Sequence, residues 1–81
     1  MNYTKVLYLL KRGNHIKHSD NVNMMNTYFS YDFNTGLITV EQYNIETVGN
    51  FWAMYLHNTF DMTVIEFISY IKENEIKFDL S

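Results

Sequence analysis

Three side chains near the start of the chain have the chemistry of metal ligands, namely His15, His18 and Asp20. Imidazole nitrogens and carboxylate oxygens both bind zinc, but a structural zinc site takes four ligands at defined spacing. The chain has no cysteine, and no pattern in the sequence brings the remaining histidine, His57, near the other three residues. We therefore expect ordinary exposed histidines, with no metal site and no cofactor.

Nucleophilic catalysis would need a serine held beside a base, and phosphate chemistry would need a glycine-rich loop ahead of a helix. The sequence contains neither a nucleophile elbow nor such a loop, and its serines are Ser19, Ser30, Ser69 and Ser81. We therefore expect a protein that is not an enzyme.

Acidic residues and tyrosines are the more informative polar side chains. No Lys or Arg lies between His18 and Tyr70, although this stretch holds several carboxylates. A carboxylate and tyrosine face without a nearby cation is attracted to a basic groove, such as one that normally holds nucleic acid. Tyrosine is also a frequent interface anchor. The predicted partner-binding residues are Asp20, Tyr28, Asp32, Glu41, Tyr43 and Glu46, with Asp20 and Glu46 at the rim.

A β-hairpin over residues 27–43 would position this face. Both of its strands alternate apolar and polar side chains, and Gly36 between them can take a positive φ. Pairing Phe33 with Ile38 and Tyr31 with Val40 gathers the large apolar groups on one face, whereas a slip of one residue would mix the two sets. The other face would carry Tyr28, Ser30, Asp32, Thr39, Glu41 and Tyr43. The tyrosines of that face could equally serve to stabilise the hairpin as a cross-strand pair.

Helices are expected on both sides of the hairpin. Residues 2–12 carry an apolar stripe at helical spacing and end at Gly13, which suits a left-handed C-terminal cap. Residues 46–59 predict a second helix with a stripe formed by Val48, Phe51, Trp52, Tyr55, Leu56 and Thr59. The aromatic part of this stripe could line a binding groove, but at helical spacing we expect it to belong to the core.

A capping box at Thr63 and Glu66 predicts a third helix, which runs to about Glu73, with Met62 and Phe67 as a hydrophobic staple. Carboxylates at or before helix N-termini, Asp61 among them, have a local explanation because they favour the helix dipole. Residues 14–18 suit an exposed basic edge strand, and residues 75–80 alternate like a closing strand.

These elements give the order α-β-β-β-α-α-β, so we expect an α+β fold in which an antiparallel sheet packs on helices. The length of 81 residues and the absence of proline favour one domain spanning residues 1–81. No run of residues approaches the length of a membrane span, and no signal peptide is recognisable, so we expect a cytoplasmic protein. The order of the strands within the sheet stays open.

The basic residues of the first segment raise the alternative of a nucleic-acid-binding regulator. Lys5, Lys11, Arg12 and Lys17 could contact phosphates, but the net charge is −3 and phosphate attraction dominates such binding. We therefore expect no direct nucleic-acid binding and assign Lys11 and Arg12 to the end of the first helix.

In length, in its abundance of Asn, Ile, Lys and Tyr, and in its lack of Cys and Pro, the chain resembles small accessory proteins of bacteriophages and other mobile elements. Proteins of that kind often inhibit host machinery stoichiometrically, and anti-CRISPR proteins are the best-known group. The resemblance implies a phage-encoded inhibitor that docks its acidic and tyrosine face on a basic site of a host enzyme such as a CRISPR effector nuclease. The alternative is a structural or regulatory phage protein that associates with itself, as a homodimer paired through the hairpin edge or the C-terminal strand.

Overall fold

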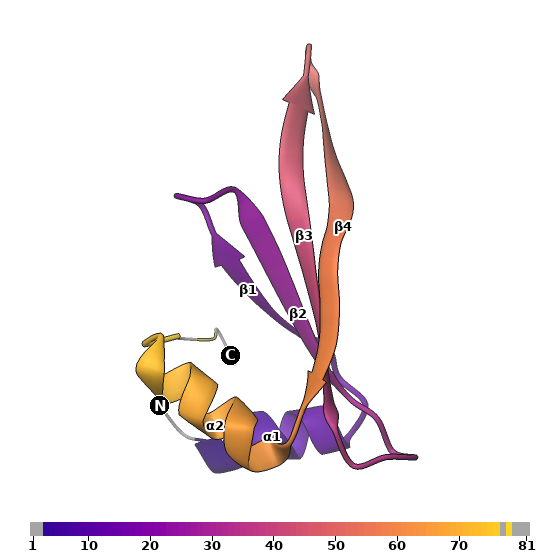
Figure 1. The fold of residues 1–81 in the computed structure, drawn as a ribbon, viewed down its shortest axis with the longest axis vertical. Coiled ribbons are helices and arrows are strands. Elements are labelled where there is room, and N and C mark those ends of the chain that lie inside the picture. The colour runs from indigo at the N-terminus through magenta and orange to yellow at the C-terminus, as the bar shows by residue number, and fades with distance from the viewer. Residues whose placement is uncertain (1–2, 77, 79–81) are drawn as a thin grey trace.

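Four strands and two helices make up the part of the chain that the computed structural model describes, residues 3–76 and 78. The antiparallel sheet has the order β1-β2-β3-β4, so neighbours in the chain are neighbours in the sheet. Both helices lie against one face of it (Figure 1). The mixed α+β class is confirmed, but the predicted element order is wrong, because the order is α-β-β-β-β-α. The elements are α1 (Tyr3–Lys11), β1 (Ile16–Asp20), β2 (Met25–Tyr31), β3 (Ile38–Val48), β4 (Phe51–Met62) and α2 (Val64–Glu73).

Helix α1 ends where its sequence predicts. The backbone N–H of Asn14 donates to the Leu9 carbonyl at 3.2 Å, and that of Gly13 donates to the Leu10 carbonyl at 3.0 Å. This pair of bonds is a Schellman motif, and it requires the left-handed conformation that Gly13 adopts at φ +92°.

The capping box at the start of α2 is also confirmed. The Thr63 hydroxyl oxygen accepts from the Glu66 N–H at 3.1 Å, and a Glu66 carboxylate oxygen accepts from the Thr63 N–H at 2.9 Å. Two of the free N–H groups at the helix start are thereby satisfied.

The hydrophobic core lies between the helices and the inner face of the sheet. Phe29 of the central strand β2 is fully buried, and the centroid of its ring lies 5.2 Å from the ring centroid of Phe67 in α2. The core is completed by one residue each of β1 and β4, two alternate residues of β3, two residues of each helix and Ile76 after α2. All the strand residues of the core face the helices, since side chains on one face recur every second residue. The buried apolar residues are Val6, Leu10, Ile16, Phe29, Ile38, Val40, Met62, Phe67, Ile71 and Ile76.

The β2–β3 hairpin forms with a different register from the predicted one. Tyr31 pairs with Ile38 and Phe29 with Val40, so the register is shifted by two residues. Asp32 begins a loop instead, because its carboxylate accepts from the Asn34 N–H at 2.8 Å and its carbonyl accepts from the Gly36 N–H at 2.8 Å. A shift of two preserves the faces of the strands. It leaves Phe33 outside the sheet and exposed.

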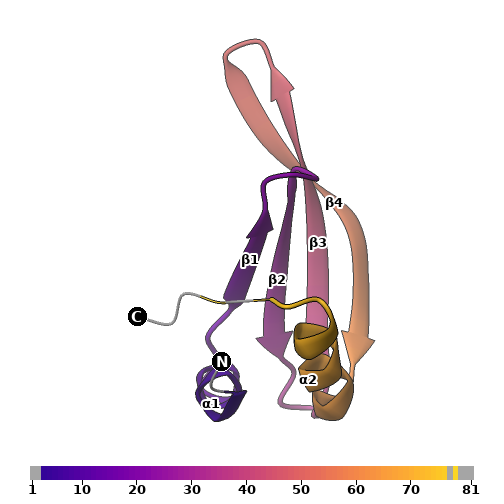
Figure 2. The same ribbon diagram turned by 90° about the vertical axis from the view of Figure 1, so that its left-hand side faces the viewer.

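The predicted helix over residues 46–59 is wrong. Strand β3 continues to Val48, and Gly49-Asn50 turns the chain back into β4, with Val48 paired to Phe51. Gly49 has φ +61° at the first central position of the turn, as a type II′ hairpin turn requires. Strand β2 stops pairing at Asn44, so residues 45–54 form a two-stranded ribbon, which we call the arm. The arm rises beyond the ends of β1 and β2 (Figures 1 and 2).

The two remaining predicted strands have different outcomes. The basic edge strand exists as β1, which begins at Ile16 and extends through Asp20. The closing strand over residues 75–80 lies partly outside the described residues. Of those described, Glu75 takes φ +51°, and the N–H of Ile76 donates to the Ile71 carbonyl, so these two residues cap α2 rather than form a strand.

Candidate functional site

The face of the sheet turned away from the helices carries three of the six predicted site residues. Tyr28 of β2 pairs directly with Glu41 of β3, and Tyr43 is two residues further along β3, so all three project from the same side. We call Tyr28, Glu41 and Tyr43, together with Asp61 described below, the outer-face site.

A hydrogen bond fixes the centre of this site. The Tyr43 hydroxyl donates to a Glu41 carboxylate oxygen at 2.9 Å. This hydrogen bond is the main reason that the pKa of Tyr43 is raised, because it stabilises the protonated phenol beside a carboxylate. The Tyr28 and Tyr43 rings meet edge to face with their centroids 5.5 Å apart. The two rings and the carboxylate are therefore held in one arrangement.

Asp61 of β4 adds a second carboxylate to this face. It pairs with Thr39, whose hydroxyl donates to the Asp61 carboxylate at 3.1 Å. Because Glu41 pairs with Thr59, Asp61 is a diagonal neighbour of Glu41, at a typical separation of about 7–8 Å. Asp61 was not among the predicted site residues, because the segment before it was predicted to be a helix and Asp61 was placed near the start of the next one. The signal that could have placed Asp61 on a strand is the alternation of polar and apolar residues in Thr59-Phe60-Asp61-Met62.

One cation shares the outer face, contrary to the expectation of a face without one. Lys17 of the edge strand β1 pairs with Tyr28, which in turn pairs with Glu41. With strands about 4.8 Å apart, Lys17 and Glu41 are separated by about 10 Å across the sheet. Lys17 therefore borders the site at its β1 side.

The other three predicted residues lie elsewhere. Asp32 is in the β2–β3 loop, and its carboxylate caps that loop. Glu46 lies in the arm opposite Ala53, on the face that continues the helix side of the sheet. Asp20 pairs with Met25 and is also on the helix side. The sequence placed all four carboxylates together, but only Glu41 belongs to the outer-face site.

Asp20 has a structural role at the β1–β2 turn. Its carboxylate accepts hydrogen bonds from the Asn23 side chain at 2.7 Å and from the backbone N–H groups of Val22 and Asn23 at 3.0 and 3.1 Å. The Asn23 side-chain bond is the main reason that the Asp20 pKa is lowered. The Asp20 carboxylate therefore stabilises the turn that follows it.

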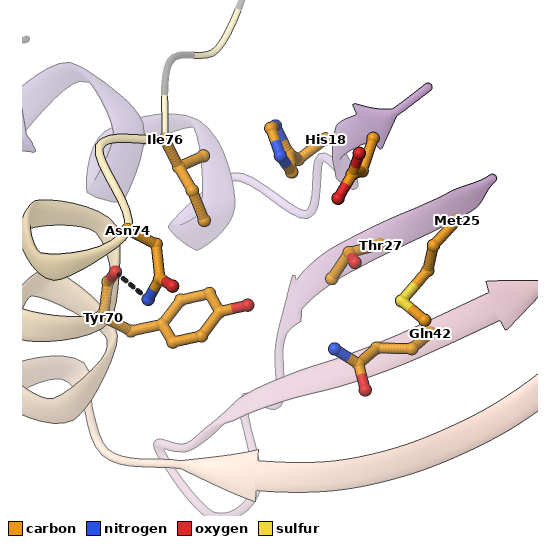
Figure 3. A pocket seen from close by; sticks show the side chains of 8 residues that line it. His18, Met25, Thr27, Gln42, Tyr70, Asn74 and Ile76 are labelled. Carbon is orange, nitrogen blue, oxygen red and sulfur yellow. Dashed lines mark hydrogen bonds between the residues drawn. The ribbon is translucent and has the colours of Figure 1, made fainter. Parts of the chain in front are cut away.

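A hollow of about 180 Å³ lies on the helix side, between β1–β3 and the end of α2 (Figure 3). The Tyr70 hydroxyl points into it, and the Asn74 side chain donates to the Tyr70 carbonyl at 2.9 Å. Ligand pockets for drug-sized molecules occupy about 300–1,000 Å³, so this hollow is too small for them. It is lined by His18, Asp20, Met25, Thr27, Gln42, Tyr70, Asn74 and Ile76.

The cations at the end of α1 contact tyrosines of their own chain. The Lys11 ammonium lies 5.9 Å from the centre of the Tyr31 ring, and the Arg12 guanidinium lies 5.5 Å from that of Tyr8. Arg12 also donates to the Tyr8 hydroxyl at 3.0 Å. These are cation–π distances, so both side chains have an intramolecular function in addition to complementing the helix end.

Within residues 3–76 and 78, no three or more histidine and acidic side chains are grouped closely enough to hold a metal ion. In the same part of the chain, neither helix has the length and apolar character that crossing a membrane would take. Comparisons of the chain with protein-family models, with curated proteins and with solved structures found no match.

Proposed function

We propose that this chain is a non-enzymatic binding protein that docks the outer-face site on a basic site of another protein. The observation that carries the proposal is the arrangement of Glu41 and Asp61 on one face of the sheet, beside the packed rings of Tyr28 and Tyr43. Complementary charge directs association and fixes orientation, while tyrosines supply contact area at low entropic cost.

The site is preorganised for such a contact. Glu41 is held by the Tyr43 hydroxyl and Asp61 by the Thr39 hydroxyl, and all four residues stand on paired strands. Groups that are already fixed lose little conformational freedom when a partner binds. Rigid strands therefore favour a defined docking geometry over a diffuse attraction.

The partner class that we propose is a bacterial nucleic-acid enzyme, specifically a CRISPR effector nuclease in the cytoplasm of the host. Such an enzyme holds phosphates in a cation-lined groove, and a carboxylate face competes for the same cations. The resemblance of the chain to small mobile-element proteins, which include the anti-CRISPR proteins, supports this choice.

A cleavage assay with a purified, guide-loaded CRISPR effector and a fluorescent target DNA tests the proposal. We expect the wild-type chain to inhibit cleavage near equimolar concentration, and the double variant Glu41→Lys, Asp61→Lys to lose inhibition. Glu73→Lys is the matched control, because it makes the same type of charge change on an exposed position of α2.

Circular dichroism of all variants verifies that the fold is retained. A wild-type chain that leaves cleavage by effectors of the main types unchanged would remove the proposed partner class. Equal inhibition by the wild-type chain and the double variant would remove the outer-face site.

A further inference from the structure

The arm exposes large apolar side chains on both of its faces. Phe51 is 80 % exposed, Trp52 is 67 % exposed, and Tyr55 at the base of the arm is 53 % exposed. With about 150–250 Å² for each aromatic side chain, these three expose roughly 300–500 Å². A stable interface buries about 800 Å² per partner, so the three rings supply roughly half of one partner's share.

The strand that carries these rings also has a free edge. β4 is the last strand of the sheet, and among the described residues only β3 pairs with it. Edge strands usually carry Lys or Pro, which discourage pairing with another chain. β1 at the opposite edge carries Lys17, whereas β4 has neither residue type. The edge of β4 is therefore open to a further strand.

We propose that two copies of this chain form a homodimer by antiparallel pairing of their β4 strands. The straight part of β4 is Phe51–Leu56, because a bulge at the Gln42–Tyr43 step leaves His57 without a partner in β3. Side chains that lie opposite each other in an antiparallel pair share one face of the sheet, so an outer-face residue must lie opposite an outer-face residue of the second copy. This condition is met only when the two-fold axis passes through a residue, which then lies opposite its own copy.

An axis at Met54 gives a complementary seam. It places Trp52 opposite Leu56 of the second copy on the outer face, and Tyr55 opposite Ala53 of the second copy on the other face. Each large ring thus meets a smaller side chain, and Met54 meets its own copy. The Trp52–Leu56 and Tyr55–Ala53 pairs therefore each combine a larger with a smaller side chain, which favours close packing.

The charge pattern favours a second copy over a charged partner. No Asp, Glu, Lys or Arg occurs from Thr47 to Phe60, so the edge strand β4 offers no opposite charge to the ionic groups of another protein between Phe51 and Phe60. Burying an unpaired ion is costly, whereas β4 of a second copy brings no ion into the seam, because the one carboxylate of the arm, Glu46, lies on β3. With the axis at Met54, the two Asp61 carboxylates lie at opposite ends of the seam and do not repel each other strongly.

The arm also gains stability from the partner. A two-stranded hairpin is at best marginally stable in water, and three or more strands are needed for independent stability. Pairing along β4 converts two such ribbons into one of four strands. Both outer-face sites then lie on the same side of a continuous sheet, although the dimer does not depend on the function proposed for that site.

Cysteine cross-linking tests the seam directly, because the chain has no cysteine of its own. Cα atoms opposite each other in an antiparallel pair are about 4.5–5.5 Å apart, within the range of about 4.4–6.8 Å that a disulfide spans. We expect mild oxidation to convert most Met54→Cys protein to a covalent dimer. Thr59→Cys is the register control, because the two thiols would be roughly 30 Å apart. Ile65→Cys is the surface control on α2.

Size-exclusion chromatography with light scattering gives the second measurement. We expect a dimer for the wild-type chain and for Ile65→Lys, which replaces an exposed apolar residue far from the arm. Leu56→Lys should raise the dimer dissociation constant by at least about tenfold, because each copy brings one ammonium group into the seam.

A wild-type chain that is monomeric at micromolar concentration overturns the proposal. So does equal cross-linking of the three cysteine variants, or a dimer that Leu56→Lys leaves unchanged while the variant stays folded by circular dichroism. If the Leu56→Lys variant does not fold, the cross-linking of the three cysteine variants tests the proposed dimer by itself. Neither experiment uses Glu41 or Asp61, so failure of the dimer and failure of outer-face binding can be told apart.

Discussion

Replacing Phe29 by alanine is the most direct measure of how the core is built. The side chain is 0 % exposed. Its ring centroid lies 5.2 Å from that of Phe67, 5.7 Å from that of Phe78 and 6.2 Å from that of Tyr70. Truncating a buried phenylalanine costs about 3–5 kcal/mol, because the cavity collapses only in part. At about 0.05–0.15 kcal/mol per residue, a chain of 81 residues has a total stability of about 4–12 kcal/mol. Phe29→Ala should therefore remove about a quarter of that stability or more.

Phe33→Ala is the matched control, with the same chemistry at a neighbouring position. Phe33 is 65 % exposed, and its one described ring contact is with Tyr31 at 5.1 Å. Losing such a contact costs about 0.5–1.5 kcal/mol. At about 4–8 °C per kcal/mol for a domain of this size, Phe29→Ala should lower the melting temperature by roughly 12 °C or more, and Phe33→Ala by much less.

Urea denaturation followed by circular dichroism measures both variants, at one fixed protein concentration because dimerisation would make stability concentration-dependent. A Phe33→Ala variant that loses as much stability as Phe29→Ala would contradict the register of the β2–β3 hairpin. It would instead support the pairing of Phe33 with Ile38. Equal unfolding slopes with urea are required for this comparison, since a changed slope signals a changed unfolded state.

Four further changes test individual features. Thr63→Ala removes the hydroxyl that caps α2 and should lower the free energy of unfolding by about 1 kcal/mol in urea denaturation; no loss would show that the cap is dispensable. Gly49→Val forces a β-branched residue to φ +61° and should cost about 1–3 kcal/mol, seen as faster amide hydrogen exchange in the arm than in the core; uniform exchange would argue against local strain. Glu75→Gly relieves a left-handed residue at φ +51° and should raise stability by up to about 1 kcal/mol, and a loss instead would show that the Glu75 side chain contributes more than the strain removes. The raised pKa of Tyr43 gives stability that is fully present below its ordinary pKa of 10.0 and is lost as the pH rises through the higher value of the folded state. Glu41→Gln should lower that pKa, as measured by tyrosinate absorbance during alkaline titration, and an unchanged titration would contradict the hydrogen bond.

Local chemistry predicted both helices that exist. The Gly13 and Thr63 signals specify caps whose hydrogen bonds form within a few residues, and these bonds are present in the structure. The alternation of residues in the β2–β3 hairpin also predicted correctly which side chains face the core. Its register could not be read from alternation, because a shift of two residues leaves both faces unchanged, and the turn formed by Asp32 selected the shifted register.

The arm was mistaken for a helix for a physical reason. A strand that buries one face alternates, but the arm carries apolar side chains on both faces, so apolar residues follow one another directly in Phe51-Trp52 and Tyr55-Leu56. Two adjacent pairs four residues apart also satisfy helical spacing. Gly49-Asn50 was the deciding signal, since a two-residue turn with glycine at its first position favours a hairpin.

The candidate site was predicted in part, in the sense that Tyr28, Glu41 and Tyr43 do share one face. Asp61 joined them only because β4 exists, so the error over residues 46–59 concealed a site residue. Asp20 and Asp32 were placed in the site on the argument that no local partner explained them. Both do have local partners, because Asp and Asn side chains readily bind the backbone of their own turn.

The sheet order β1-β2-β3-β4 has a consequence for how the chain reaches its native state. Each strand after β1 pairs with the strand that precedes it in the chain, so every pairing closes a short loop and costs little chain entropy. Topologies with such local pairing fold fast for their class. Val6 near the start and Phe67 near the end share one core, however, so their contact closes the longest loop, and prior formation of the three hairpins between them lowers the chain entropy that this closure costs.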